Sequence, residues 1–221
     1  MKNMTTIAML LILLGSCGQL TDKSSKQVNQ NEETNQVKDD KLDKTVVQSI
    51  KDYYQINFGK GSRLEESTND TIIELTYYNI PDKDDEHDGF LISITIPLTK
   101  NQELFSAIPI LEGDLNKDQK NDLVISVHTE GGGGGGNVWS QDIFVFIYDN
   151  EKYKLVNVTS DRDVCGCNGN FRVRKIENNL IVGSSSCYAE DDARCCPSLH
   201  YETKVAFENN KLKYVSKIKM K

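Results

Sequence analysis

The sequence predicts an α+β protein that is built mostly from antiparallel β-sheet and has one short N-terminal helix. Beyond residue 70, apolar and polar residues alternate with a period of two, which is the pattern of strands. Turn signals rich in Asn, Asp and Glu separate these segments by hairpin distances, which favours antiparallel pairing. We therefore expect about eight to ten strands, stapled by disulfides, in a single domain over residues 45–221.

The first element of that domain is predicted to be the helix. Its apolar residues recur at the spacing of one helix face, and they are Val46, Val47, Ile50, Tyr53 and Tyr54. The predicted strands then cover 72–78, 90–96, 123–127, 143–148, 154–158, 171–176, 180–182, 201–207 and 212–215. Because segment 143–148 is apolar on both faces, we expect a central strand that is covered on both sides, with the helix on one of them.

Residues 1–16 are predicted to be a lipoprotein signal peptide. Lys2 precedes an apolar run over 7–14, which is too short to span about 30 Å of bilayer hydrocarbon. The following Leu14-Gly15-Ser16-Cys17 resembles a bacterial lipobox, whose cysteine thiol receives a diacylglycerol before cleavage. The resemblance implies acylation of Cys17, for example with palmitate, and a lipid anchor in the cell envelope. An ordinary signal peptide, with Cys17 in a disulfide, is the alternative.

Two further features concern the region after cleavage. Gly18 rather than Asp follows the cysteine, and by resemblance to Gram-negative lipoproteins this favours the outer membrane. Residues 17–44 then comprise the lipidated cysteine and a polar stretch without an aromatic residue. Such a stretch cannot bury enough apolar surface to offset its ordering entropy, so we expect a flexible tether that spans roughly 30 Å.

An acidic loop precedes the predicted strand at 123–127. Asp114, Asn116, Asp118 and Asp122 place side-chain oxygens at relative positions 1, 3, 5 and 9, and the Lys120 carbonyl can complete an oxygen shell. Oxygen ligands at this spacing suit a hard cation, so the loop predicts a structural calcium site. The alternative is a turn whose carboxylates accept hydrogen bonds from backbone amides.

The acidic loop resembles the calcium loops of FG-GAP and integrin-type propeller blades. It also resembles the Gly-Asp-Leu-Asn-x-Asp-x-x-x-Asp pattern of many uncharacterised bacterial secreted domains. Such loops usually carry Gly at position 6, where the chain prefers positive φ. Here Gln119 occupies that position, at a cost of about 1 kcal/mol.

A glycine run from Gly131 to Gly136 separates two predicted strands and reads as a hairpin loop. Its bare backbone and the single tryptophan, Trp139, offer a contact surface for a partner, unless Trp139 packs inward as core. Together with the acidic loop and Cys195-Cys196-Pro197-Ser198, the run extends the resemblance to uncharacterised bacterial lipoprotein domains over residues 113–207.

Five cysteines remain beyond Cys17, and they are Cys165, Cys167, Cys187, Cys195 and Cys196. An exported protein meets an oxidising compartment, so we expect two disulfides and one thiol. Neighbouring cysteines pair only with strain, which favours bonds between clusters over bonds within them. A zinc site that uses four thiols, or a histidine such as His200, is the alternative, although the spacing lacks the usual C-x2-C knuckles.

The net charge and the absence of known catalytic motifs restrict the classes of function that the sequence supports. The formal net charge is −7 and the pI about 5.1, which argues against nucleic acid as a partner. No Gly-x-Ser-x-Gly, His-Glu-x-x-His or dinucleotide fingerprint occurs. The leading hypothesis is a non-catalytic envelope lipoprotein that presents a binding domain to a protein or glycan. A hydrolase that uses carboxylates in 82–88 and 114–122, or a cysteine-based zinc or redox sensor, remains an alternative.

Overall fold

The computed structural model describes residues 41–80, 90–100, 103–104, 109–131, 139–193 and 196–221. All of them belong to one compact unit that runs from Asp39 to Lys221. Cys17, Gly136, Cys195 and the acidic segment 82–88 lie outside the described residues, as do the expected signal peptide and most of the expected tether. Over the described ranges, no helix is long and apolar enough to cross a bilayer.

The described chain forms two helices and eleven strands, in the order α1 (Lys44–Phe58), β1 (Arg63–Thr68), β2 (Ile72–Ile80), β3 (Phe90–Pro97), β4 (Ile110–Gly113), β5 (Asp122–Gly131), β6 (Trp139–Asp149), β7 (Lys152–Ser160), α2 (Asp161–Val164), β8 (Gly169–Glu177), β9 (Leu180–Cys187), β10 (Leu199–Glu208) and β11 (Lys211–Lys219). The mostly antiparallel β-sheet predicted from the sequence is thereby confirmed. The strand count is somewhat higher than the expected eight to ten, because β1 and β4 were not expected.

The larger sheet contains seven strands in the order β1-β2-β3-β5-β6-β7, and β4 also pairs with β5. Every pairing is antiparallel. β3 pairs with the C-terminal half of β5, where Ile94 lies opposite Thr129, whereas β4 pairs with the N-terminal half, where Ile110 lies opposite Ile125. The two short partners thus share one side of β5, and β6 occupies the other side.

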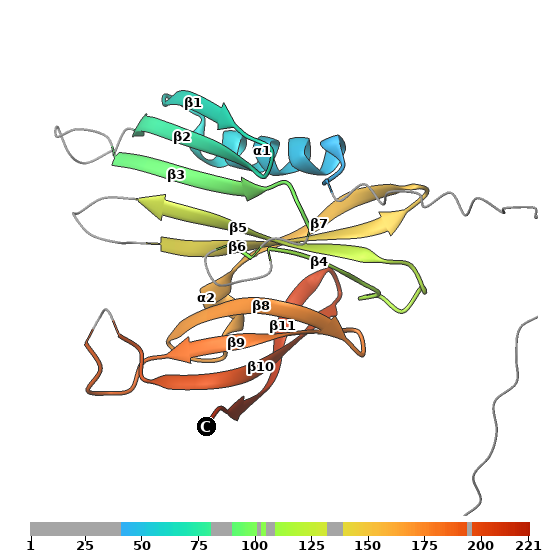
Figure 1. Ribbon diagram of the computed structural model, residues 1–221, viewed down its shortest axis with the longest axis vertical. Coiled ribbons are helices and arrows are strands. Elements are labelled where there is room, and N and C mark those ends of the chain that lie inside the picture. Colours follow the sequence, from blue (N-terminus) through green and yellow to red (C-terminus); the bar gives the residue numbers. More distant parts are fainter. Residues whose placement is uncertain (1–40, 81–89, 101–102, 105–108, 132–138, 194–195) are drawn as a thin grey trace, which may run out of the picture. The chain divides into compact units, whose positions relative to one another are not determined.

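Helix α1 packs against one face of the larger sheet (Figure 1). It begins after Asp43, whose Oδ1 accepts a hydrogen bond from the Thr45 amide (2.7 Å) and so satisfies one of the free donors of the first turn. The buried face of the helix carries Val46, Ile50 and Tyr54, as its apolar spacing predicts. These side chains join a core of sheet residues that includes Ile73, Leu75, Tyr77, Ile94, Ile96, Leu123, Ile125, Val127, Phe144 and Phe146.

The smaller sheet, in the order β11-β10-β9-β8, packs with β5 and β6 through a second core. That core unites Val124, Ile143 and Val145 of the larger sheet with Phe171, Val173, Ile181, Val205 and Leu212 of the smaller one. The short α2 contacts β6, β7 and β8, and so lies where the two sheets meet (Figure 1). β6 is therefore buried on both faces, as the apolar run over 143–148 predicts.

The packed region begins before Thr45. Leu42 is buried in the core next to α1, and its amide donates a hydrogen bond to the Leu98 carbonyl (2.9 Å). Lys41 forms an isolated bridge with Thr99. Residues 41–44, which the sequence assigned to the tether, thus include a core position, because a single apolar residue in a polar stretch gives no periodic signal.

Candidate functional site

The acidic loop between β4 and β5 uses its side chains mainly as acceptors for its own backbone. Asp114 Oδ1 accepts hydrogen bonds from the amides of Lys117 (2.6 Å) and Asp118 (3.2 Å). Asn116 Oδ1 also accepts from the Asp118 amide (3.0 Å). Asp118 Oδ1 in turn accepts from the Lys120 amide (2.9 Å). This is the amide-capped turn that the sequence left open as the alternative to a calcium loop.

Asp122 closes the loop from the first position of β5. It is fully buried, and its two oxygens accept hydrogen bonds from the amides of Leu115 (2.9 Å) and Tyr148 (3.0 Å). Burial raises the pKa of this carboxyl, and the negative charges of Asp118 and Asp114 raise it further. Within the described ranges, no three His, Cys, Asp or Glu side chains gather around a point that could hold a metal ion.

The cysteines follow part of the expected pattern. Cys167 and Cys187 form a disulfide, which is a bond between clusters as predicted. Cys196 is also disulfide-bonded. Among the described cysteines, Cys165 is the one free thiol; it is buried, and its Sγ donates to the carbonyls of Arg162 (3.1 Å) and Cys167 (2.7 Å). The sulfur atoms of Cys167 and Cys187 are bonded to each other, so these two cysteines do not provide thiolates for a zinc ion.

The predicted contact residues lie where β5 ends and β6 begins. Gly131 is the last residue of β5 and has φ +110°; a Cβ there would collide with the Leu91 carbonyl oxygen, so glycine is required. Trp139 is the first residue of β6, pairs with Glu130 and is half-buried. The β5–β6 hairpin expected around the glycine run is confirmed, while Gly136 lies outside the described part of the chain.

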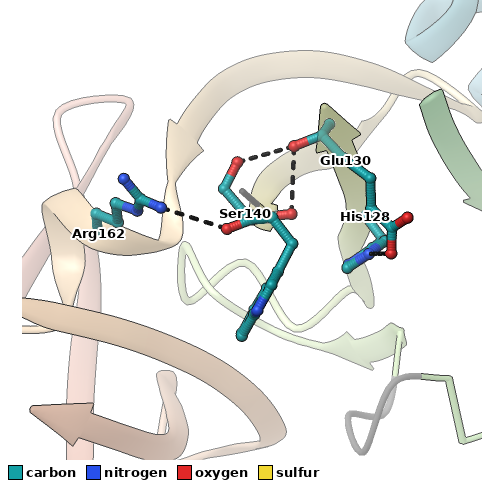
Figure 2. Close-up of polar contacts among 6 residues, drawn as sticks. His128, Glu130, Ser140 and Arg162 are labelled. Carbon is teal, nitrogen blue, oxygen red and sulfur yellow. Dashed lines mark hydrogen bonds and ion pairs between the residues drawn. The ribbon is translucent and has the colours of Figure 1, made fainter. Parts of the chain in front are cut away.

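Trp139 lies on the face of the larger sheet that is turned toward the smaller sheet. Its ring is stacked near His128 (centroids 6.0 Å apart), and the Arg172 guanidinium of β8 lies 5.2 Å from the ring centroid. Arg162 Nη2 of α2 donates to the Trp139 carbonyl (3.3 Å), and His128 Nε2 lies 2.8 Å from Glu130 Oε1 (Figure 2). Trp139 is therefore held by Arg162 of α2 and Arg172 of β8 and is only partly available to a partner.

A row of buried polar side chains crosses the same face. Thr95 lies opposite His128, which lies opposite Gln141, and Asp161 follows at the start of α2. Each of the four is less than 9 % exposed. Gln141 Oε1, Asp161 Oδ2 and the nearby Ser126 Oγ have no hydrogen-bond partner among the described residues. Burial raises the pKa of Asp161 to about 6.

The opposite face of the same strand ends carries a cavity of about 360 Å³ under α1. It is lined by Tyr53, Asn57, Phe58, Ile92, Thr129, Glu130, Gly131, Ser140 and Asp142. Thr129 and Ser140 lie opposite each other on β5 and β6, and their hydroxyl oxygens are 2.8 Å apart (Figure 2). The predicted contact residue Gly131 thus lines a cavity that is bounded by α1, β3, β5 and β6.

Asp142 supplies a carboxyl group with a shifted pKa to this cavity. The Tyr54 hydroxyl donates a hydrogen bond to Asp142 Oδ2 (2.8 Å). Burial raises the pKa of the Asp142 carboxyl, which the Tyr54 hydrogen bond only partly offsets. Burial and the Asp142 charge also raise the pKa of Tyr53. Asp142 is half-buried, and no hydrogen bond from the described residues reaches its Oδ1, so this oxygen remains available to a ligand.

A second cavity, of about 730 Å³, lies at the start of α1. Its lining is Lys41, Leu42, Asp43, Lys44, Val47, Gln48, Lys51, Ile73, Leu98, Lys100, Leu123 and Tyr153. Several of its charged groups already have partners: Lys51 pairs with Glu66 (2.6 Å), Lys100 pairs with Glu112 (2.5 Å), and Asp43 caps the helix. The smaller cavity, with its unused carboxylate oxygen, is therefore the better candidate for ligand binding.

The sequence pointed to Gly131 but not to the other residues of this cavity. Its lining comes from α1, β3, β5 and β6, which are far apart in the chain. One signal was present: Asp142 stands at a position of β6 that faces the helix, beside Phe144. A carboxyl at such a position is rare unless it has a specific partner.

Comparisons with known proteins return no relative of this chain: no family model, no curated protein and no solved structure matches it. Function is therefore inferred from the motifs of the chain and from the geometry of its sites.

Proposed function

We propose that this chain is a lipid-anchored protein of the bacterial cell envelope, in the outer membrane, that presents a non-catalytic β-rich binding domain. The resemblance of Leu14 to Cys17 to a lipobox supports the anchor. The disulfide between Cys167 and Cys187 supports export, because such bonds persist in oxidising compartments. The tether between Cys17 and the folded unit is long enough to hold the domain clear of the lipid headgroups.

The observation that carries the binding function is the cavity under α1 with the Asp142 carboxylate in its lining. A concave site with a few convergent polar groups and a shifted pKa is the usual form of a ligand site. The walls belong to a helix and to central strands, which hold a site more precisely than loops do. The ligand is a small polar group, either free or as part of a glycan or protein.

We assign the acidic loop a structural calcium ion, bound by Asp114, Asn116, Asp118, Asp122 and the Lys120 carbonyl. Asp114, Asn116 and Asp118, at relative positions 1, 3 and 5 of the loop, carry side-chain oxygens in one tight turn, which supports the assignment. Calcium would replace backbone amides as the partner of these oxygens. Its role is to stiffen the connection from β4 to β5, the strand that leads to the cavity.

Acylation and partition into detergent test the anchor. The full-length chain, produced in a Gram-negative bacterium, should incorporate labelled palmitate and enter the detergent phase of a Triton X-114 extract. The Cys17→Ser variant should lose both properties, whereas Cys165→Ser, which changes a buried thiol of the domain, should keep them. Labelling of the Cys17→Ser variant, or a wild-type protein without label, would refute lipid attachment at Cys17.

A further inference from the structure

The charge of the cavity under α1 is one-sided. Its described lining includes the acidic residues Asp142 and Glu130 and no Lys, Arg or His, and of the two carboxylates only that of Asp142 lies on the helix side of the sheet. Glu130 is exposed and lies 2.8 Å from His128 Nε2 on the other face of the sheet. Asp142, in contrast, is half-buried, accepts a hydrogen bond from the Tyr54 hydroxyl and has no cation bonded to it among the described residues. A ligand that brings a positive charge would therefore neutralise a charge that the protein leaves unpaired.

The hydrogen-bonding groups of the cavity include several acceptors. Asp142 Oδ1 has no hydrogen bond within the described residues. The Asn57 amide nitrogen donates one of its two hydrogens to the Tyr53 carbonyl (2.7 Å), so its amide oxygen and one N–H are left for a ligand. The Thr129 and Ser140 hydroxyls engage each other at 2.8 Å. Such a set calls for a ligand with several donors, and an ammonium group supplies three.

Aromatic walls favour the same chemistry. Tyr53 and Phe58 line the cavity from α1. Tyr53 packs edge-on against Phe144 (centroids 5.2 Å apart), and Phe58 stacks on Tyr54 (6.2 Å), so both rings are fixed. A ring face attracts a cation within about 6 Å. The volume of about 360 Å³ holds on the order of ten to twelve water-sized groups, which is the size of one sugar unit or one amino acid.

We propose that the cavity under α1 binds a small ligand that carries a primary ammonium group, with that group on Asp142 and its carbon skeleton against Tyr53 and Phe58. This inference rests on the proposed binding function and specifies its ligand. An amino sugar of a glycan and the side chain of an amino acid both present this chemistry.

Glucosamine and glucose form a matched pair of probes, because they differ by an ammonium group in place of one hydroxyl. Isothermal titration at neutral pH, with the full-length protein extracted in detergent, should give at least tenfold tighter binding of glucosamine than of glucose. The Asp142→Asn variant keeps an acceptor for the Tyr54 hydroxyl but lacks the charge. It should bind glucosamine at least tenfold more weakly than the wild type and no better than glucose.

Two further variants separate this contact from general effects. Asp163→Asn removes another negative charge that acts on Asp142 but does not line the cavity, and it should keep the preference for glucosamine. Phe58→Leu removes one aromatic wall and should lower the affinity for glucosamine two- to fivefold. An unchanged melting temperature of the unliganded Asp142→Asn protein would show that the variant is folded.

The outcomes distinguish the existence of a binding site under α1 from its preference for an ammonium group. Equal affinity of wild type for glucose and glucosamine, with both weakened by Phe58→Leu, would overturn the ammonium specificity and leave the binding site standing. No binding of either probe at tens of millimolar would count against both the specificity and the site. Unaltered glucosamine affinity in Asp142→Asn would overturn the role of the carboxylate.

Discussion

The carboxyl group of Asp161 is completely buried at the start of α2, and burial raises its pKa to about 6. A backbone hydrogen bond from Gln141 and the charge of Arg162 offset only part of this effect. The unfolded carboxyl releases its proton near its ordinary pKa of 3.8. Between about pH 4 and pH 6 the folded state therefore binds more protons than the unfolded state, and the free energy of unfolding falls as the pH rises.

The Asp161→Asn variant should lose this pH dependence. At pH 8 it should exceed the wild type in free energy of unfolding by up to about 3 kcal/mol, since one pKa unit corresponds to about 1.4 kcal/mol. The difference should vanish near pH 4, where the wild-type carboxyl is neutral as well. Urea unfolding of both proteins across this range measures it, with the exposed Asp163→Asn as control. Parallel curves for wild type and Asp161→Asn would contradict the shifted pKa.

Gln119 has φ +66°, which confirms the positive φ expected at the sixth position of the acidic loop. A non-glycine residue pays for this conformation, so Gln119→Gly should raise the free energy of unfolding by about 1 kcal/mol. Asn121→Gly, two residues on and without a positive φ, should lower it instead. Thermal melts of the three proteins check this, and a destabilised Gln119→Gly would show that the loop carries no strain at this residue.

At the scale of elements, the parts with a periodic apolar pattern were predictable. The stripe from Val46 to Tyr54 predicted α1, and period-two alternation together with short apolar runs such as 143–148 predicted nine of the eleven strands. β1 was missed because all six of its residues are exposed, so no face repeats apolar residues. β4 and α2 have four residues each, which is too short for any period to show.

Only the part of the candidate site that depends on local backbone conformation, namely its glycine, was predictable from the sequence. Gly131 was singled out because it begins the glycine run, and the structure shows that its positive φ requires glycine. Asp142 and Asn57 were not singled out, because they meet only through the packing of α1 on the sheet. The buried row of Thr95, His128 and Gln141 likewise arises from strand register. These three residues are far apart in the sequence, and the sequence alone does not show which of them lie opposite each other.

The disulfide between Cys167 and Cys187 joins the open ends of the β8–β9 hairpin, since Gly169 pairs with Cys187. Its partners are 20 residues apart, so the bond should contribute about 3 kcal/mol by restricting the unfolded chain. The double variant Cys167→Ser/Cys187→Ser should lose that amount in urea unfolding under oxidising conditions. Cys165→Ser serves as control, because it keeps the bond. Equal losses in the two variants would mean that the bond itself adds little.

The acidic loop should respond to calcium. At about 100 times its dissociation constant, an ion that binds only the folded state adds about 2.7 kcal/mol, or roughly 5 to 10 °C in melting temperature. Calorimetry of the metal-stripped protein, before and after addition of calcium, should show this rise, and Asp118→Ala should abolish it. Magnesium is the matched control ion. A wild-type melt that calcium leaves unchanged would identify the loop as an amide-capped turn alone.

At the scale of the whole molecule, the central strands β5 and β6 connect the cavity, the row of buried polar groups and the acidic loop. One face of these strands packs on α1 and the other on the smaller sheet. Their adjoining ends carry the cavity on the helix side and the row of buried polar groups on the other. The acidic loop leads directly into β5. The cavity, the Asp161 carboxyl and the acidic loop thus all adjoin this one pair of strands.

The most direct test of the central claim is chemical-shift mapping of the ¹⁵N-labelled protein during titration with glucosamine. We expect saturable shifts at the amides of Asn57, Thr129 and Ser140, which line the cavity, and little change at Arg172 and Asp118, which lie elsewhere. Shifts that cluster around Arg172 or around Asp118, with none at the three cavity residues, would contradict a ligand site under α1.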